Sequence, residues 1–237
     1  MNFTGDYHTH TKYSRFGHGK NTIQEMVKRA EELGLVSYGI SDHGPKHVLF
    51  KCKPKYFDEI RQQVEEINKT SKVKVYFGIE ADLIKKDGSI DMTEEQIKKL
   101  DYLVVGYHKC AINNFYCFLR NWFNPKKQKE INTEAYINCL RRYKVKFISH
   151  LNEHVKVDVL KVAQEAKKQG TAIELNIKHL RFNEEEAKAL IESGCDLILS
   201  SDAHSVDRVA KFDNVLAFVE KYNIPKERIL NIDKVFM

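Results

Sequence analysis

Residues 102–108 read Tyr-Leu-Val-Val-Gly-Tyr-His, a short apolar run that ends in a histidine. A comparable run, Leu-Ile-Leu-Ser-Ser-Asp, covers residues 197–202 and ends in an aspartate. Apolar runs without polar alternation are typical of parallel strands that are buried on both faces. The two runs therefore predict a parallel sheet that is covered by helices.

Five more β-rich runs alternate with stretches of helical period, and this alternation is the pattern of repeated βα units. The predicted strands are 4–8, 36–41, 74–80, 102–107, 146–149, 172–176 and 197–201. The predicted helices are 22–33, 57–68, 93–100, 133–143, 157–169, 183–193 and 206–222. Residues 109–131 are long for a βα connection, and we interpret them as a lid or rim insertion. No linker divides the 237 residues, so the sequence predicts a single α/β barrel domain over 1–237.

Composition narrows the function classes. No apolar run approaches the roughly 18 residues of a membrane span, and the polar N-terminus does not resemble a signal peptide, so a cytoplasmic protein without a membrane partner is expected. Five cysteines without a C-x-x-C pair do not predict disulfides or a thiolate zinc site. The net charge of +6 is spread along the chain, which does not favour a nucleic acid partner.

Histidines and carboxylates follow the predicted strands at the same relative position. Barrel enzymes collect their active sites at the carboxyl ends of the strands, so these side chains are expected to meet there. The residues are His8, His10, His43, Glu80, His108, His150, Asp202 and His204. In His8-Thr9-His10 the two imidazoles point the same way, because side chains alternate along an extended chain. Imidazole and carboxylate donors suit Zn²⁺, Mn²⁺ or Fe²⁺.

So many donors exceed what one structural ion can use, which points to catalysis. Two or three neighbouring divalent ions can hold phosphate oxygens and lower the pKa of a bound water from about 15.7 towards about 7. The sequence therefore predicts a multi-metal hydrolytic centre. A small phosphorylated substrate is the expected partner.

The motifs around these residues resemble the PHP family, named for polymerase and histidinol phosphatase. The matching stretches are DYHTHTKYS, GISDHGP, FGIEA, VVGYH, FISH and LSSDAH, which span nearly the whole chain. The resemblance implies a distorted seven-stranded (β/α)7 TIM-like barrel and three divalent metal ions. It assigns His8, His10, Glu80 and Asp202 to one metal, Glu80, His108 and His150 to a second, and His18, His43 and His204 to a third.

Other residues near the strand ends are candidates for contact with the substrate. Lys178 and Arg181 follow the sixth strand and are predicted to bind phosphate, with two solvated charges as the alternative. We interpret His47, His154 and His179 as surface or substrate-facing histidines, because no spacing supports them as ligands. The family commonly has Pro-Gly and small serines at Leu151-Asn152 and Ile177-Lys178, and these departures affect the substrate more than the metals.

The leading functional hypothesis is a metal-dependent phosphomonoesterase for a small metabolite, with histidinol phosphate, and hence histidine biosynthesis, as the first candidate. Glu80, Asp202 and His204 are its predicted catalytic residues. A 3′-5′ exonuclease or phosphodiesterase acting on nucleic acid is the nearest alternative. A non-catalytic metal-binding partner module is the third hypothesis.

Overall fold

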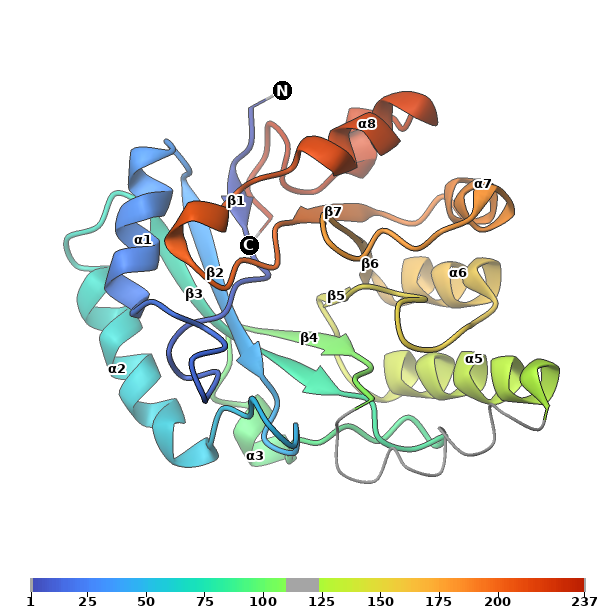
Figure 1. Cartoon of the computed structure of the whole chain (residues 1–237), viewed down its shortest axis with the longest axis horizontal. Helices are drawn as coiled ribbons and strands as arrows, with labels where there is room; N and C mark the ends of the chain where they lie inside the picture. Colours follow the sequence, from blue (N-terminus) through green and yellow to red (C-terminus); the bar gives the residue numbers. More distant parts are fainter. Residues whose placement is uncertain (1, 110–123, 237) are drawn as a thin grey trace.

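The computed structural model describes residues 2–109 and 124–236. Its centre is one parallel seven-stranded sheet whose strand order follows the sequence (Figure 1). The strands are β1 (Gly5–Asp6), β2 (Ser37–His43), β3 (Lys74–Asp82), β4 (Tyr102–Gly106), β5 (Phe147–Ile148), β6 (Ala172–Asn176) and β7 (Leu197–Ser200). All seven lie within two residues of the predicted strand bounds, which confirms the α/β architecture.

The sheet curls into a barrel that closes by a short seam. β1 and β7 form no ladder, but Thr9 and Ala203 make an isolated parallel bridge just beyond their ends. The amide of His10 donates to the carbonyl of Ala203 at 2.8 Å. The side chain of Asp6 also accepts a hydrogen bond from the Ser201 amide. The distorted seven-stranded barrel expected from the resemblance is therefore confirmed.

Helices cover the outside of the sheet. They are α1 (Ile23–Glu32), α2 (Phe57–Ile67), α3 (Glu94–Ile97), α5 (Pro125–Arg142), α6 (Val159–Gln169), α7 (Glu184–Glu192) and α8 (Asp213–Lys221). Short 3-10 helices span Pro54–Tyr56, Val206–Arg208 and Lys226–Arg228. The capping box of Thr22 and Glu25 begins α1, and Ile23, Met26, Val27 and Ala30 form its buried face. None of the helices in the described residues is long and apolar enough to cross a membrane.

Two helix predictions need correction. The predicted helix 206–222 is interrupted, because Ala210 has a φ of 53° and α8 begins only at Asp213. The predicted helix 133–143 begins earlier, at Pro125, where the side chain of Asn124 caps the first turn. Part of the predicted insertion 109–131 is therefore helical. Residues 110–123 lie outside the described part, and the lid interpretation stays a prediction.

The two ends of the barrel interior are filled differently. Aromatic and aliphatic side chains from the first positions of several strands pack at the amino-terminal end, among them Tyr7, Tyr102, Phe147 and Ile198. The Tyr102 hydroxyl lies 2.8 Å from the carbonyl oxygen of Tyr7 and 2.9 Å from that of Ile40, so this buried hydroxyl is satisfied. The described cysteines, Cys52, Cys139 and Cys195, are buried and free. The carboxyl-terminal end of the barrel carries the polar residues.

Candidate metal centre

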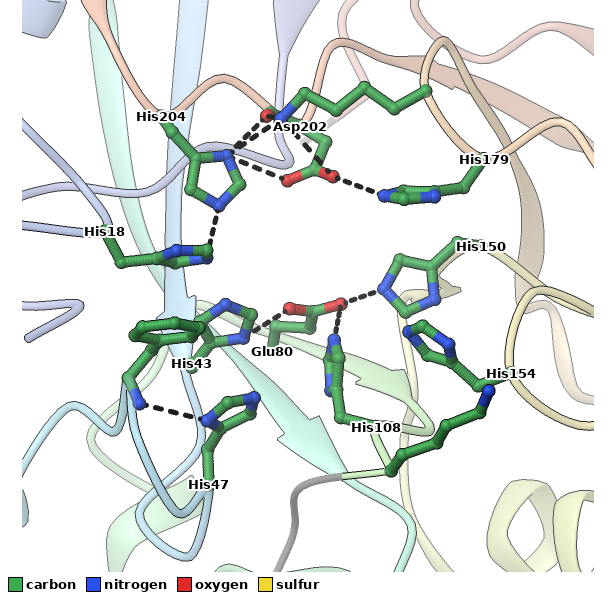
Figure 2. Close-up of a pocket in the computed structure, with 13 residues that line it drawn as sticks. His18, His43, His47, Glu80, His108, His150, His154, His179, Asp202 and His204 are labelled. Atoms are coloured by element: carbon green, nitrogen blue, oxygen red, sulfur yellow. Dashed lines mark hydrogen bonds and ion pairs between the residues drawn. The ribbon is translucent and has the colours of Figure 1, made fainter.

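Every histidine of the chain lies at one cavity at the carboxyl ends of the strands. Eight of the ten line the cavity, which has a volume of about 530 Å³. His8 and His10 lie next to these eight, since the ring of His8 is 5.8 Å from that of His150 and the ring of His10 is 4.3 Å from that of His43. Figure 2 shows the imidazoles around Glu80 and Asp202. Strands far apart in sequence thus supply one site.

Glu80 is the centre of the arrangement. It belongs to β3, and the register pairs it with His43 on β2 and with Val104 on β4. Its Oε1 atom lies 2.7 Å from His150 Nε2 and 3.3 Å from His8 Nε2. Its Oε2 atom lies 3.0 Å from His43 Nδ1. One carboxylate therefore contacts ligand candidates from three different strand ends.

The donor atoms gather in overlapping groups of three, within which all ligand atoms lie within 4.8 Å of one another. These groups are His8, His10 and Asp202; His8, Glu80 and His150; His10, His43 and His204; and His43, His47 and His108. His18 lies beside the third group, because its Nε2 atom is 2.7 Å from that of His204. All nine donors predicted from the sequence are thus brought together at one cavity, and their role as ligands stays a prediction.

Several buried donor atoms have no hydrogen-bond partner. They are Nε2 of His8, Nε2 of His10, both ring nitrogens of His43, and Oε2 of Glu80. Carboxylate oxygens lie 3.3 Å from Nε2 of His8, 3.2 Å from Nε2 of His10 and 3.0 Å from Nδ1 of His43, but these contacts are not hydrogen bonds. An unsatisfied buried polar atom costs about 1–3 kcal/mol, which a bound cation would offset. Imidazole nitrogens and carboxylate oxygens are the ligands that Zn²⁺ and related ions prefer. The donor set therefore fits divalent cations.

Two carboxylates behind the donors fix imidazole orientation. Asp82, two residues after Glu80, lies 2.8 Å from Nδ1 of His108. Glu174, on β6, lies 2.5 Å from Nδ1 of His8 and also accepts the amide of His150 at 2.5 Å. An imidazole that binds a metal through one ring nitrogen usually donates a hydrogen bond from the other nitrogen to a carboxylate or a carbonyl. Our sequence analysis missed both residues, although each carries a carboxylate near a strand end.

A third buried carboxylate fixes the loop after β2. Asp91 accepts the amide of Lys46 at 2.8 Å and that of Asp82 at 2.9 Å. A Cβ atom at Gly44 would lie 2.3 Å from Asp91 Oδ2. Only glycine lets the loop approach Asp91 so closely, so this contact holds the chain on both sides of Gly44 in place.

The backbone is strained at two of the predicted ligands. His150 has a φ of 26° and Asp202 a φ of 50°, in a region that residues other than glycine rarely adopt. Such conformations cost about 1–3 kcal/mol each and cluster at functional sites. Gly106 supports the same region, because a Cβ atom there would lie 2.4 Å from Ser149 Oγ and 3.1 Å from Glu80 Oε1.

Electrostatics favour charged carboxylates but divide the imidazoles, because carboxylates outweigh burial and raise the pKa of His8, through Glu174 and Glu80, and that of His150, through Glu80. Burial opposes ionisation of Glu80, but His108, His8 and His150 outweigh it and hold its pKa well below the usual range. Burial likewise opposes ionisation of Asp202, and neighbouring histidines, His8 first, hold its pKa low. Burial lowers the pKa of His108 and that of His204 to about 4. Deprotonated ligands of this kind are those that a cation binds.

The predicted substrate-binding residues differ in their placement. Lys178 lines the cavity, and its Nζ atom lies 2.9 Å from His204 Nδ1 and 3.7 Å from Asp202 Oδ2. Arg181 donates to Glu153 at 2.7 Å, and it is not among the described residues that line the cavity. His47, His154 and His179 all line it. His47 is buried rather than at the surface.

Comparisons with known proteins identify the family of this chain. The PHP domain family model matches residues 6–198. A probable phosphatase from Acetivibrio thermocellus is 33% identical over 98% of this chain and 92% of its own length. A probable phosphatase from Shewanella piezotolerans is 30% identical over 98% of this chain and 90% of its own.

Solved structures share the fold at low identity. The histidinol phosphate phosphatase of Lactococcus lactis, solved with zinc, L-histidinol and phosphate, superposes with a TM-score of 0.60 at 15% identity, over 95% of this chain and 93% of that one. A putative histidinol phosphatase from Listeria monocytogenes gives 0.62 at 16% identity, over 87% and 97%. The family match over most of the sequence, together with relatives that align end to end, shows that this chain belongs to the PHP domain family and groups with its phosphatases.

Proposed function

We propose that this protein is a metal-dependent phosphomonoesterase that acts on a small metabolite at a three-metal centre. The observation that carries the proposal is the position of Glu80, whose two oxygens face separate sets of imidazoles. A carboxylate so placed suits a ligand shared between ions. The unpartnered nitrogens of His8, His10 and His43 support the same interpretation.

The donor groups suggest how the ions are held. His8, His10, Glu80 and Asp202 would bind the first, Glu80, His108 and His150 the second, and His18, His43 and His204 the third. Divalent ions held by these residues would offset phosphate charge and would make a water nucleophile available near neutral pH. Glu80, Asp202 and His204 act in catalysis by fixing the centre, and Asp82 and Glu174 hold the imidazoles of His108 and His8.

Lys178 provides a positively charged side chain that can bind the phosphate group of the substrate. Its ammonium group lies beside His204 and Asp202, so a phosphate bound at the metals comes within its reach. The cavity volume of about 530 Å³ lies in the range of sites for small molecules, about 300–1,000 Å³. This size and the scattered surface charge favour a small monoester over nucleic acid. Histidinol phosphate is the first monoester to assay, since L-histidinol and phosphate are bound in the Lactococcus lactis structure.

The test combines metal analysis with activity on two substrate classes. We expect purified protein to contain zinc, manganese or iron and to hydrolyse small phosphomonoesters. Chelation should abolish turnover, and Mn²⁺ or Zn²⁺ should restore it. Activity that is indifferent to chelation would contradict the metal mechanism. Faster release of mononucleotides from single-stranded DNA than phosphate from any monoester would instead favour the exonuclease hypothesis.

A further inference from the structure

The cavity wall outside the predicted ligands has a marked charge bias. Seven of the thirteen lining residues belong to the ligand set, and the other six are His47, Phe50, Lys109, His154, Lys178 and His179. None of these six is acidic. Residues 110–123, which follow Lys109 in the sequence, contain neither aspartate nor glutamate. Neither group of residues therefore supplies a carboxylate for a positively charged part of a substrate.

Glu153, an acidic residue beside this wall, is already paired. Glu153 accepts from Nε of Arg181 at 2.7 Å, and its other oxygen lies 3.2 Å from Nδ1 of His179. Recruiting Glu153 to bind a substrate ammonium would break its contact with a guanidinium. Glu80 and Asp202 face the imidazoles and would be committed to the cations. These three carboxylates of the described residues are thus engaged.

His47 presents a proton to the cavity. The amide of Phe50 donates to His47 Nδ1 at 3.0 Å, so this nitrogen carries the lone pair. In a neutral imidazole the ring proton then lies on Nε2. His47 in this tautomer is a hydrogen-bond donor, and it also belongs to the group with His43 and His108 whose donor atoms lie within 4.8 Å of one another. A donor at this position suits an oxyanion.

The two lysines lie on different sides of the centre. Lys178 is beside His204. Lys109 directly follows His108 and lines the cavity together with His154. The ring of His154 is 5.8 Å from that of His108 and 5.9 Å from that of His150. Figure 2 shows His154 and His204 on opposite sides of the cavity. If Lys178 binds the phosphate, Lys109 is therefore the positive side chain that remains to contact the leaving group.

We propose that the preferred substrate is a phosphomonoester whose alcohol carries a second anionic group, a carboxylate or another phosphate, held by Lys109 and His154. This inference rests on the proposed function and defines its substrate class. An ammonium group in the same place would face a lysine and find no carboxylate, so alcohols with a positive charge, including histidinol, are disfavoured. The anionic group gains a charge-assisted hydrogen bond from Lys109.

Matched monoesters test the inference with the metal-loaded, full-length protein. 3-Phosphoglycerate and glycerol 3-phosphate differ by a carboxylate in place of a hydroxymethyl group, and fructose 1,6-bisphosphate and fructose 6-phosphate differ by one phosphate. Phosphoethanolamine and histidinol phosphate supply the positive alcohols. We expect kcat/KM for at least one anionic member to exceed that of its neutral partner by about tenfold, as one charge-assisted hydrogen bond allows. The positive alcohols should be the poorest.

The variant Lys109→Gln assigns the preference to its source. It should lower kcat/KM for the anionic member about tenfold while affecting the neutral partner much less. Lys144→Gln is the matched control, because Lys144 is exposed and precedes β5 at the other end of the barrel. It should change neither value. The preference of the unmodified protein should also decline as salt is added, since the contact with exposed Lys109 is ionic.

The outcomes separate the inference from the function on which it rests. Equal turnover of neutral and anionic partners, or a preference for histidinol phosphate, would overturn the inference and leave the phosphatase proposal intact. An anionic preference that Lys109→Gln preserves would overturn the assignment to Lys109. Failure to hydrolyse every monoester with metals bound would contradict the proposed function itself.

Discussion

The interior of the barrel is filled by different kinds of side chain at its two ends. At the amino-terminal end, Tyr7, Tyr102 and Phe147 fill the interior, and the Tyr102 hydroxyl finds two carbonyl partners. At the carboxyl-terminal end, imidazoles crowd together, and nitrogens of His8, His10 and His43 lack partners. The first end is complete within the polypeptide. Under the proposed function, cations would complete the second, so stability and chemistry would be divided along the barrel axis.

The largest expected effect comes from Asp202→Asn. The substitution removes a charged ligand candidate, so kcat should fall by more than about 10³-fold while circular dichroism stays unchanged. Asp196→Asn is the matched control, because Asp196 is exposed and directly precedes the first residue of β7, at the amino-terminal end of the barrel. Comparable losses in both variants would show that the two ends are not functionally distinct.

Ile198→Ala tests the amino-terminal end. Ile198 is fully buried in the aromatic cluster, so truncation should lower the free energy of unfolding by about 2–5 kcal/mol. Denaturant titration measures the change. Metal content per folded molecule should remain that of the unmodified protein. A loss of bound metal in folded protein would mean that the two ends are coupled.

Glu174→Gln tests whether a carboxylate that contacts predicted ligands contributes to metal binding at the carboxyl-terminal end. The amide cannot serve both His8 Nδ1 and the His150 amide as a carboxylate does, so metal affinity should fall by about 10–100-fold. Metal titration with a competing chelator gives the value. Glu192→Gln, at the exposed end of α7, should leave affinity unchanged. Unaltered affinity in Glu174→Gln would show that orientation of His8 does not depend on this residue.

Tyr102→Phe gives the smallest expected effect. It removes one buried hydroxyl and leaves the carbonyls of Tyr7 and Ile40 without that donor, at a cost of about 1 kcal/mol in unfolding free energy. Denaturant midpoints detect this shift, and turnover should not change. A loss of turnover at constant stability would contradict the division between the ends.

Most of this architecture could be predicted from the sequence, because short β-rich runs and helical periodicity indicate the strands and helices. A short β-rich run predicted β6 at its observed bounds, and the rule that active sites of barrel enzymes lie at the carboxyl ends of the strands predicted where the histidines gather. The roles of Asp82 and Glu174 were not predicted. The imidazole that each carboxylate contacts comes from another strand, and the sequence alone does not show that pairing. The interruption at Ala210 also escaped, since nothing local in Val209-Ala210-Lys211 marks a break. The contact of Arg181 with Glu153 is tertiary and could not be predicted from the sequence, and the phosphate-binding role of Arg181 stays a prediction.

The seam between the first and last strands has a consequence for biogenesis. Backbone pairing there is slight, with the Thr9–Ala203 bridge as its main element, yet His8 and His10 meet Asp202 across it. Cations bound to these residues would act as a clasp that fastens the chain's beginning to its last fifth. A nascent chain on the ribosome lacks half of that clasp until residue 202 has emerged, so full metal loading follows synthesis of most of the protein.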